Sequence, residues 1–457
     1  MRQPSDRRRA RRFGRAVVVV LLGGLAACVP PRTEQPVDPV PPSVDPGSLL
    51  IGCDQAATRV TVTVSAHLDP SCTYTGGFDI STSGVVFDCR GAHVEDPEGD
   101  DGVGILVTAP TTVALAHVAV RNCFVKGFLN NVRVSRSGFK TLTPGEEYEA
   151  PFSDIAVEHS HLYGSRGVGA YVDAFVTGVT LRGLDIIGSG STGVYLEAGS
   201  KDNVVEDSTI SSNGFRDVSP DGAPFFVGGV ELRYQSTGRE GIAVDGSRDN
   251  VIRRNWIVGN AAGGIFLYKN CGEYATQQPA QHWVRNYGAD GNLIEGNLVT
   301  TGSTGIWVGS RQAENTLPLD CSDPTYVANP QIRLDHAANN VIRGNSMSFL
   351  TYGVRVEDDG TRIEGNRFDH GIGPAQAVLV GTKYRTTVLD RPVRDTVLTG
   401  NVATYAGNDT PFRWIWDHDA TTETANTANG APTLLAPGEQ PPINPFIFAI
   451  RVWVPGS

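Results

Sequence analysis

The chain has 457 residues, of which 40% are hydrophobic and 8% aromatic, so it contains enough apolar material for a large buried core. The 53 glycines and the frequent valine and isoleucine favour strands and turns. The formal net charge of −11 becomes about −17 once the arginine-rich leader described below is removed. Because the rest of the chain has no lysine or arginine cluster, the sequence excludes a nucleic-acid partner.

The chain begins with the features of an export signal. A basic segment at residues 7–15 is followed by 12 apolar residues at 16–27, too few to span a hydrocarbon core of ~30 Å. The sequence Leu25-Ala26-Ala27-Cys28 resembles a bacterial lipobox. The resemblance implies a signal peptide at 1–27, lipidation of Cys28 and export as a protein that touches the membrane only through this anchor. An ordinary signal peptide with a chance cysteine is the alternative.

A proline-rich segment at 28–48 follows and is expected to be an extended tether.

Six cysteines remain after Cys28, and an even number in an exported chain predicts three disulfides. Their spacing is not that of a zinc site. They are Cys53, Cys72, Cys89, Cys123, Cys271 and Cys321.

Short strand-like segments recur along the middle of the chain. Segments of one kind contain asparagine at their breaks, at Asn203, Asn250, Asn255, Asn292, Asn297, Asn340, Asn345, Asn366 and Asn401. Segments of a second kind begin with Gly-Ile or Gly-Val, as at Gly241 and Gly264. Periods of roughly 20–50 residues are typical of solenoids. Asparagine tolerates left-handed backbone geometry and can bond to the equivalent asparagine one coil away, so each break is predicted to be a corner of a coil.

This pattern resembles the right-handed parallel β-helix proteins of the pectate-lyase-like superfamily. The resemblance covers residues 49–405. It implies an all-β fold, a single-stranded right-handed parallel β-helix with loop insertions and terminal caps, in which 406–457 form a C-terminal cap or tail. We expect a monomer. The resemblance does not identify a reaction, because the signature segments of polygalacturonases and alginate epimerases are absent.

Stacking of coils also predicts the disulfides. Cys89 and Cys123 end similar segments, Val-Phe-Asp-Cys and Val-Arg-Asn-Cys, and equivalent positions on adjacent coils lie ~4.8 Å apart, which suits a disulfide. By elimination and proximity, Cys53 pairs with Cys72 in the N-terminal cap and Cys271 pairs with Cys321 between loops.

Four longer insertions, at 214–238, 270–288, 312–335 and 382–394, predict a groove beside the Gly-Ile strands. Alternation gives these strands two outward columns of side chains. The aromatic residues of the first column indicate either a platform for sugar rings or packing beneath loops. The first column is Tyr171, Tyr195, Ala243, Phe266, Trp307 and Arg355, and the second is Asp173, Glu197, Asp245, Tyr268, Gly309 and Glu357.

Asp173, Glu197 and Asp245 would place like charges on successive coils, which destabilises strand pairing. One reason for such an arrangement is a Ca²⁺ site, the only cofactor that the sequence suggests. Another is a carboxylate with a raised pKa for acid–base catalysis. The remaining alternatives are a different register or separation by the 214–238 insertion.

The residues beside this column suggest chemistry on a polysaccharide. Tyr268 and Lys269 could act as acid and base in removing a proton next to a carboxylate. Arg239, Arg311 and Arg355 could neutralise that carboxylate. A lyase or epimerase acting on an acidic glycan is therefore the first hypothesis. A glycoside hydrolase using Asp245 with Glu197 or Asp173 is the second, and a non-catalytic glycan-binding adhesin is the third.

Overall fold

The computed structural model describes residues 47–99, 102–143, 145–227, 230–269, 287–309, 325–326, 329–333, 336–387, 389–438 and 451–452. The predicted signal peptide, Cys28 and nearly all of the tether lie outside these residues. Cys271, Arg311 and Cys321 lie outside them as well. Among the described residues, no helix has the length and apolar character needed to cross a membrane.

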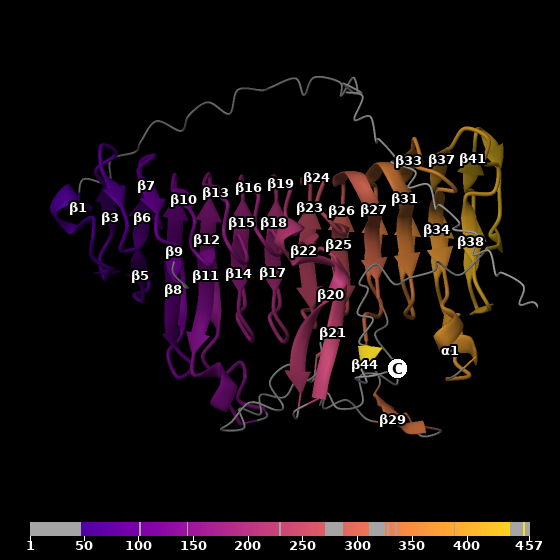
Figure 1. Ribbon diagram of the computed structural model, residues 1–457, viewed down its shortest axis with the longest axis horizontal. Coiled ribbons are helices and arrows are strands. Elements are labelled where there is room, and N and C mark those ends of the chain that lie inside the picture. Colours follow the sequence, from indigo (N-terminus) through magenta and orange to yellow (C-terminus); the bar gives the residue numbers. More distant parts are fainter. Residues whose placement is uncertain are drawn as a thin grey trace, which may run out of the picture. The chain divides into compact units, whose positions relative to one another are not determined.

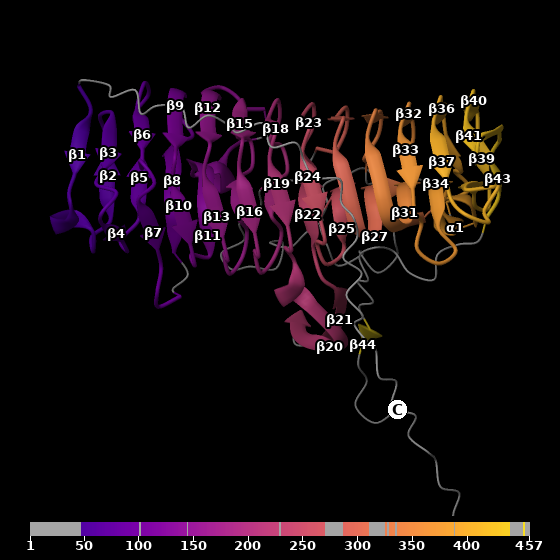
Figure 2. The same ribbon diagram turned by 90° about the horizontal axis from the view of Figure 1, so that it is seen from above.

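Three stacks of parallel strands form the body of the chain (Figures 1 and 2). The first stack is a 13-stranded sheet, which we call the first sheet. It consists of β1 (Leu49–Ile51), β3 (Ala66–Leu68), β6 (Val86–Asp88), β9 (Leu115–Arg121), β12 (Phe152–Glu158), β15 (Val179–Arg182), β18 (Val204–Glu206), β23 (Val251–Arg253), β26 (Leu293–Glu295), β30 (Val341–Arg343), β32 (Arg362–Glu364), β36 (Val397–Thr399) and β40 (Thr422–Thr424).

The other two stacks belong to one 24-stranded sheet and are joined by two long strands, β27 (Leu298–Val308) and β31 (Ser346–Val356). The short row contains β4 (Thr73–Tyr74), β7 (His93–Glu95), β10 (Phe124–Lys126), β13 (His161–Tyr163), β16 (Asp185–Ile187), β19 (Thr209–Ser211), β24 (Trp256–Val258), β33 (Arg367–Asp369), β37 (Val402–Thr404) and β41 (Thr427–Ala428). The long row contains β2 (Val60–Val62), β5 (Phe78–Ile80), β8 (Val103–Pro110), β11 (Asn130–Ser137), β14 (Ala170–Val172), β17 (Val194–Leu196), β22 (Glu240–Asp245), β25 (Gly263–Tyr268), β34 (Gln376–Val380), β38 (Phe412–Trp414) and β43 (Ala436–Pro437).

The remaining elements lie in turns and insertions. β20 (Val218–Val227) and β21 (Val230–Thr237) form an antiparallel hairpin that projects beside β22, and β44 (Arg451–Val452) pairs with β21 (Figure 2). β42 (Ala431–Pro432) pairs antiparallel with β41 and completes the 24-stranded sheet. The others are β28 (Thr325–Tyr326), β29 (Asn329–Arg333), β35 (Val393–Arg394), β39 (His418–Asp419), α1 (Lys383–Thr387) and the 3₁₀ turns η1 (Cys53–Gln55), η2 (Phe139–Thr141) and η3 (Phe215–Asp217).

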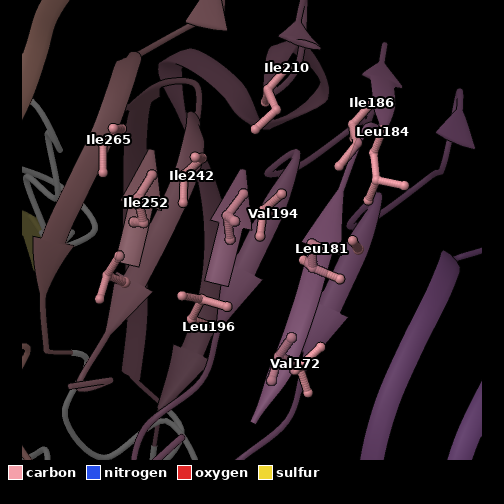
Figure 3. Packing of buried hydrophobic residues seen from close by; sticks show 14 of the residues in the cluster. Val172, Leu181, Leu184, Ile186, Val194, Leu196, Ile210, Ile242, Ile252 and Ile265 are labelled. Carbon is pink, nitrogen blue, oxygen red and sulfur yellow. The ribbon is translucent and has the colours of Figure 1, made fainter. Parts of the chain in front are cut away.

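Inward side chains of all three stacks meet in one continuous core. Strand side chains alternate between the two faces, so the register that pairs Val172 with Leu196 also places both in the interior. Figure 3 shows part of this core, with Leu181 of the first sheet, Ile186 of the short row and Val194 of the long row. The repeated valine, isoleucine and leucine positions of the sequence therefore face inward.

The asparagine breaks are corners, as predicted. The amide of Asn255 donates to Oδ1 of Asn297 at 3.0 Å, and Asn297 donates to Oδ1 of Asn345 at 2.9 Å. The predicted left-handed backbone is wrong for these asparagines, because the positive φ belongs to the preceding residue, as in Arg254 (φ 54°) and Gly296 (φ 63°). The preceding residue makes the turn, and the asparagine then points its amide into the buried ladder.

The first sheet carries a charge ladder on its outer face. Acidic and basic residues alternate from coil to coil in the order Asp88, Arg121, Glu158, Arg182, Glu206, Arg253, Glu295, Arg343 and Glu364. Arg253 Nε lies 2.7 Å from Glu206 Oε2, and Arg343 Nε lies 2.7 Å from Glu295 Oε1. Opposite charges on neighbouring strands stabilise their pairing, so this face has a structural role.

The predicted disulfides Cys53–Cys72 and Cys89–Cys123 are both confirmed.

The parallel coils continue past Tyr405, the predicted end of the β-helix, because β38 pairs with β34 and β40 pairs with β36. The C-terminal strand β44 pairs with the hairpin strand β21. Part of the segment 406–457, expected to form a cap or tail, therefore contributes strands to the coils themselves.

Candidate functional site

The outer face of the long row presents the two columns predicted from alternation. The first column is confirmed, because Tyr171, Tyr195, Ala243, Phe266, Trp307 and Arg355 are successive register partners. The second column is in the predicted register as well. Asp245 pairs with Tyr268, and backbone hydrogen bonds between neighbouring coils continue along the other members of the column. The alternative of a different register is therefore wrong.

The prediction of an open aromatic platform is wrong. Trp307 is 0% exposed and Tyr195 is 8% exposed, and both belong to a buried cluster with Phe266 and Tyr268. Only Tyr171, at the edge of this cluster, is partly exposed. These aromatic side chains face outward from the coil and are covered, which matches the alternative of packing beneath other parts of the chain.

The three stacked carboxylates each accept a hydrogen bond from a first-column residue of the preceding coil. Arg133 Nε donates to Asp173 at 2.8 Å, the Tyr171 hydroxyl donates to Glu197 at 2.6 Å, and the Tyr195 hydroxyl donates to Asp245 at 2.5 Å. Each carboxylate thus has a donor that offsets the repulsion expected from the sequence.

These carboxylates do not converge as a cation site. Within the described ranges, the one group of three acidic, cysteine or histidine residues with ligand atoms within 4.8 Å of one another is Cys53, Asp69 and Cys72. Two members of that group form a disulfide. The described geometry of Asp173, Glu197 and Asp245 therefore gives no support to the expected Ca²⁺ site.

The first-column residues form a stack of rings and cations. Tyr171 and Tyr195 are parallel within 6°, with ring centroids 5.2 Å apart. Arg133 lies 5.2 Å from the Tyr171 ring centroid, and Arg239 lies 6.0 Å from that of Tyr195. Such cation–π contacts fix the rings and place a guanidinium at either end of the tyrosine pair.

Arg239 connects this stack to a second hydroxyl. Its Nη2 donates to the Tyr268 hydroxyl at 3.0 Å, and that hydroxyl donates to Glu240 Oε1 at 2.9 Å. Burial raises the pKa of Glu240, and the neighbouring Arg239 opposes this shift. Burial also raises the pKa of Asp173, against the effect of Arg133. The site therefore combines a buried phenol, a guanidinium and a carboxyl that retains its proton more readily than usual.

Glu240 and Arg133 were missed by the sequence analysis. Strict alternation would turn Glu240 inward like Ile242. Gly241, which lies between them, faces the interior too, because a Cβ added to it would lie 2.7 Å from Asn260 Nδ2. Two consecutive inward residues turn Glu240 outward at the corner. Arg133 could have been found by extending the first column back by one coil, because it is the register partner of Tyr171.

The other predicted site residues do not all lie with Tyr268. Lys269 is buried, follows Tyr268 directly and exerts its charge on Asp290, whose pKa is raised by burial. Lys269 lies directly after the last residue of β25, and the expected acid–base pair of Tyr268 and Lys269 stays a prediction. Arg355 lies on β31, beyond Trp307, and pairs with Glu357 at 2.6 Å. Arg311 lies outside the described residues.

Comparison with known proteins identifies the fold. Residues 118–273 match a family described as "Right handed beta helix region". The chain is a right-handed parallel β-helix. No curated protein sequence matches it.

Three solved structures are similar to this β-helix at low identity. The A-module of a mannuronan C-5 epimerase from Azotobacter vinelandii is 13% identical with a TM-score of 0.49, over 85% of this chain and 92% of that one. An alginate lyase from Paenibacillus is 15% identical with a TM-score of 0.41, over 84% and 99%. A GH87 α-1,3-glucanase from Streptomyces thermodiastaticus is 11% identical with a TM-score of 0.41, over 83% and 61%.

Proposed function

We propose that this β-helix is an exported, lipid-anchored protein that modifies an acidic polysaccharide by removing the proton next to a sugar carboxylate. The observation that carries the proposal is the position of the Tyr268 hydroxyl, between Arg239 at 3.0 Å and Glu240 at 2.9 Å. A phenol, a guanidinium and a proton-retaining carboxyl are suited to acid–base chemistry beside a developing negative charge.

The reaction can be assigned to these groups in balanced steps. The Tyr268 hydroxyl gives its proton to Glu240 Oε1, 2.9 Å away, and the resulting phenolate, stabilised by Arg239, takes the proton from the carbon next to the substrate carboxylate. The electron pair left on that carbon is delocalised into the carboxylate. In elimination, the neighbouring C–O bond then breaks, a C=C bond forms and the leaving oxygen takes a proton from the Glu240 carboxyl. In epimerisation, a water molecule on the opposite face gives a proton to the same carbon, Glu240 gives its proton to the resulting hydroxide, and no bond of the chain is cut.

Access of a substrate to Tyr268 requires a movement of the chain. Its side chain is 0% exposed, so a sugar reaches it only if the parts of the chain that cover this face move aside. The partly exposed end of the first column, at Tyr171 and Arg133, offers the first contact surface for substrate. Tyr171 stacks on Tyr195, and Tyr195 lies beside Arg239. These contacts lead from the partly exposed end to Arg239, which donates to the Tyr268 hydroxyl.

Replacement of Tyr268 by phenylalanine tests the proposal. The variant keeps the ring and its packing against Trp307 but loses the hydroxyl, so turnover should fall by roughly 100-fold or more. Tyr163→Phe, on the outer face of the short row, is the matched control and should keep full turnover. Elimination is read from ultraviolet absorption of unsaturated products, epimerisation from composition without cleavage. Equal turnover in Tyr268→Phe and wild type would contradict the assignment.

A glycan-binding protein without catalysis is the second candidate. Glu197 and Asp245 are buried and accept hydrogen bonds from tyrosines. This arrangement can serve structure without catalysis, and it therefore favours the second candidate. Retained glycan affinity without any product would support this candidate. New reducing ends alone would instead support the hydrolase hypothesis.

The proposed anchor has a separate test. Cys28→Ser should move the protein from the membrane fraction to the soluble fraction, because the lipid is attached to the Cys28 sulfur. Metabolic labelling with a fatty acid should mark the wild type alone. Labelling of both proteins would contradict lipidation at Cys28.

A further inference from the structure

We propose that Lys201 and Arg248 form an anion-binding subsite that holds carboxylate groups of the glycan outside the reacting centre. The inference rests on the proposed function, since it names the part of the substrate that the protein grips. The two residues occupy equivalent positions on neighbouring coils, where they form a parallel β-bridge. Neighbouring strands are ~4.8 Å apart, which is comparable to the length of one sugar unit in an extended chain.

Each of the two cations rests on a tyrosine ring. The Lys201 ammonium lies 4.9 Å from the ring centroid of Tyr148, and the Arg248 guanidinium lies 5.1 Å from that of Tyr287. The two rings are 6.0 Å apart and meet edge to face. Side chains held in this way lose less freedom when they bind a ligand, which favours a preorganised site over two mobile surface charges.

The cations also remain available to a ligand. Their side chains are 26% and 32% exposed, and each pairs with the aspartate that follows it, Asp202 at 3.3 Å and Asp249 at 3.2 Å. These aspartates are 56% and 49% exposed. Ion pairs this exposed contribute little to stability, so a substrate carboxylate can replace either aspartate at small cost.

The subsite is joined to the candidate reacting centre by the backbone. The nitrogen of Gly199 donates to the carbonyl of Gly246, and the nitrogen of Gly246 donates to the carbonyl of Tyr268. The Tyr148 hydroxyl donates to the Gly199 carbonyl at 2.6 Å. The cation pair therefore lies at the corner where β17 and β22 end, next to the strand that carries Tyr268.

The placement of the two cations favours a glycan over a lipid surface as the ligand. The formal net charge of −11 repels an anionic membrane and an acidic glycan alike, so binding depends on the local pair. Two neighbouring cations suit carboxylates repeated along a polymer. A neutral glycan would gain nothing from them.

The test is binding by the Lys201→Gln, Arg248→Gln double variant of the full mature chain. Calorimetry with polymannuronate and polygalacturonate at low and high salt measures Kd, and neutral dextran and vesicles containing phosphatidylglycerol serve as comparison ligands. The matched control is Lys126→Gln, Arg343→Gln, which removes two exposed charges from other faces. We expect Kd for the polyuronates to rise roughly ten-fold or more in the double variant, with a weaker salt dependence. The control should match wild type.

The outcomes separate this inference from the proposed function. Equal polyuronate affinity in wild type and the double variant would overturn the subsite, whether or not Tyr268→Phe abolishes turnover. If the double variant loses polyuronate binding and the wild-type protein shows no turnover, the subsite is supported and the proposed reaction is overturned. A loss confined to the vesicles would overturn the subsite in favour of a lipid headgroup.

Discussion

The Tyr195 hydroxyl donates a hydrogen bond of 2.5 Å to Asp245 Oδ2, and the two residues lie on neighbouring coils of the long row. The same diagonal relation links Tyr171 to Glu197 and Arg133 to Asp173. A column that reads as repulsive in the sequence is therefore a series of donor–acceptor pairs in the fold. The carboxylates tolerate burial because each donor is fixed by the stacked rings beside it.

Removal of one such donor should cost stability. Tyr195→Phe keeps the stack with Tyr171 but deletes the hydroxyl that bonds to Asp245, a residue with 0% exposure. We expect the free energy of unfolding to fall by about 1–3 kcal/mol, the usual cost when a buried acceptor loses a donor. Urea denaturation measures it. Tyr163→Phe, on the partly exposed short row, should be close to neutral, and an equal loss in both variants would argue against a special role for the diagonal bond.

The buried carboxyl of Glu240 should give stability a particular pH dependence. Its pKa is raised by burial, so the folded state binds the proton more tightly than the unfolded state, whose pKa is about 4.3. The stabilisation is complete below this unfolded-state pKa and is lost as pH rises through the raised folded-state pKa. Glu240→Gln removes the titrating group, so its stability relative to wild type should increase with pH. Urea denaturation at pH 4, 6 and 8 measures the difference.

The exposed Glu98 provides the comparison for this pH series. Glu98→Gln changes an exposed side chain and should keep the stability of wild type. A stability difference between Glu240→Gln and wild type that stays constant across the series would show that Glu240 does not act through its proton.

The fold was predictable from the sequence because a solenoid repeats its local constraints. Each asparagine corner has two requirements. The residue before the asparagine must accept a positive φ, and the asparagine amide must reach the next coil. The same pattern therefore recurs in the sequence, as at Asn255 and Asn297. The columns were predictable for the same reason, since strict alternation holds within β14, β17 and the later part of β22.

The candidate site was less predictable because it depends on departures from the repeat. Glu240 faces outward only because Gly241 occupies a corner too tight for a Cβ. The burial of Trp307 and Tyr268 depends on tertiary packing that strand periodicity does not encode. Alternation gives the face of a side chain, and it does not say what covers that face.

The charge ladder of the first sheet predicts a salt-dependent variant. Arg253 lies between Glu206 and Glu295 in the register, and Arg253→Glu would place three glutamates on successive coils. We expect the free energy of unfolding to fall by about 1–3 kcal/mol at low salt, because two attractive pairs become repulsive. The loss should shrink in 0.5 M salt through screening. Arg367→Glu, whose register partners are Ser346 and Val402 and whose ion pair is with Asp369 of its own strand, should show a smaller effect, and salt-independent losses would contradict the ladder.

The asparagine ladder runs through the buried corner between the first sheet and the short row. Asn297 accepts from both the backbone nitrogen and the side-chain amide of Asn255 at 3.0 Å. It donates to Oδ1 of Asn345 and to the carbonyl of Ile252, both at 2.9 Å. Asn426, at the last coil of the same ladder, accepts from Asn401 and donates only to the carbonyl of Leu398 in the described part of the chain.

This difference in position predicts a difference in cost. Asn297→Ala deprives groups on both neighbouring coils of their partners in a site that is 1% exposed, so the free energy of unfolding should fall by about 3 kcal/mol or more. Asn426→Ala breaks the ladder on one side and should cost clearly less. Urea denaturation with a check that the m-value is unchanged compares the two variants on the same scale. If Asn426→Ala were as destabilising as Asn297→Ala, the ladder would act as separate corner bonds, and the coupling between successive coils would have to come from the core and the backbone alone.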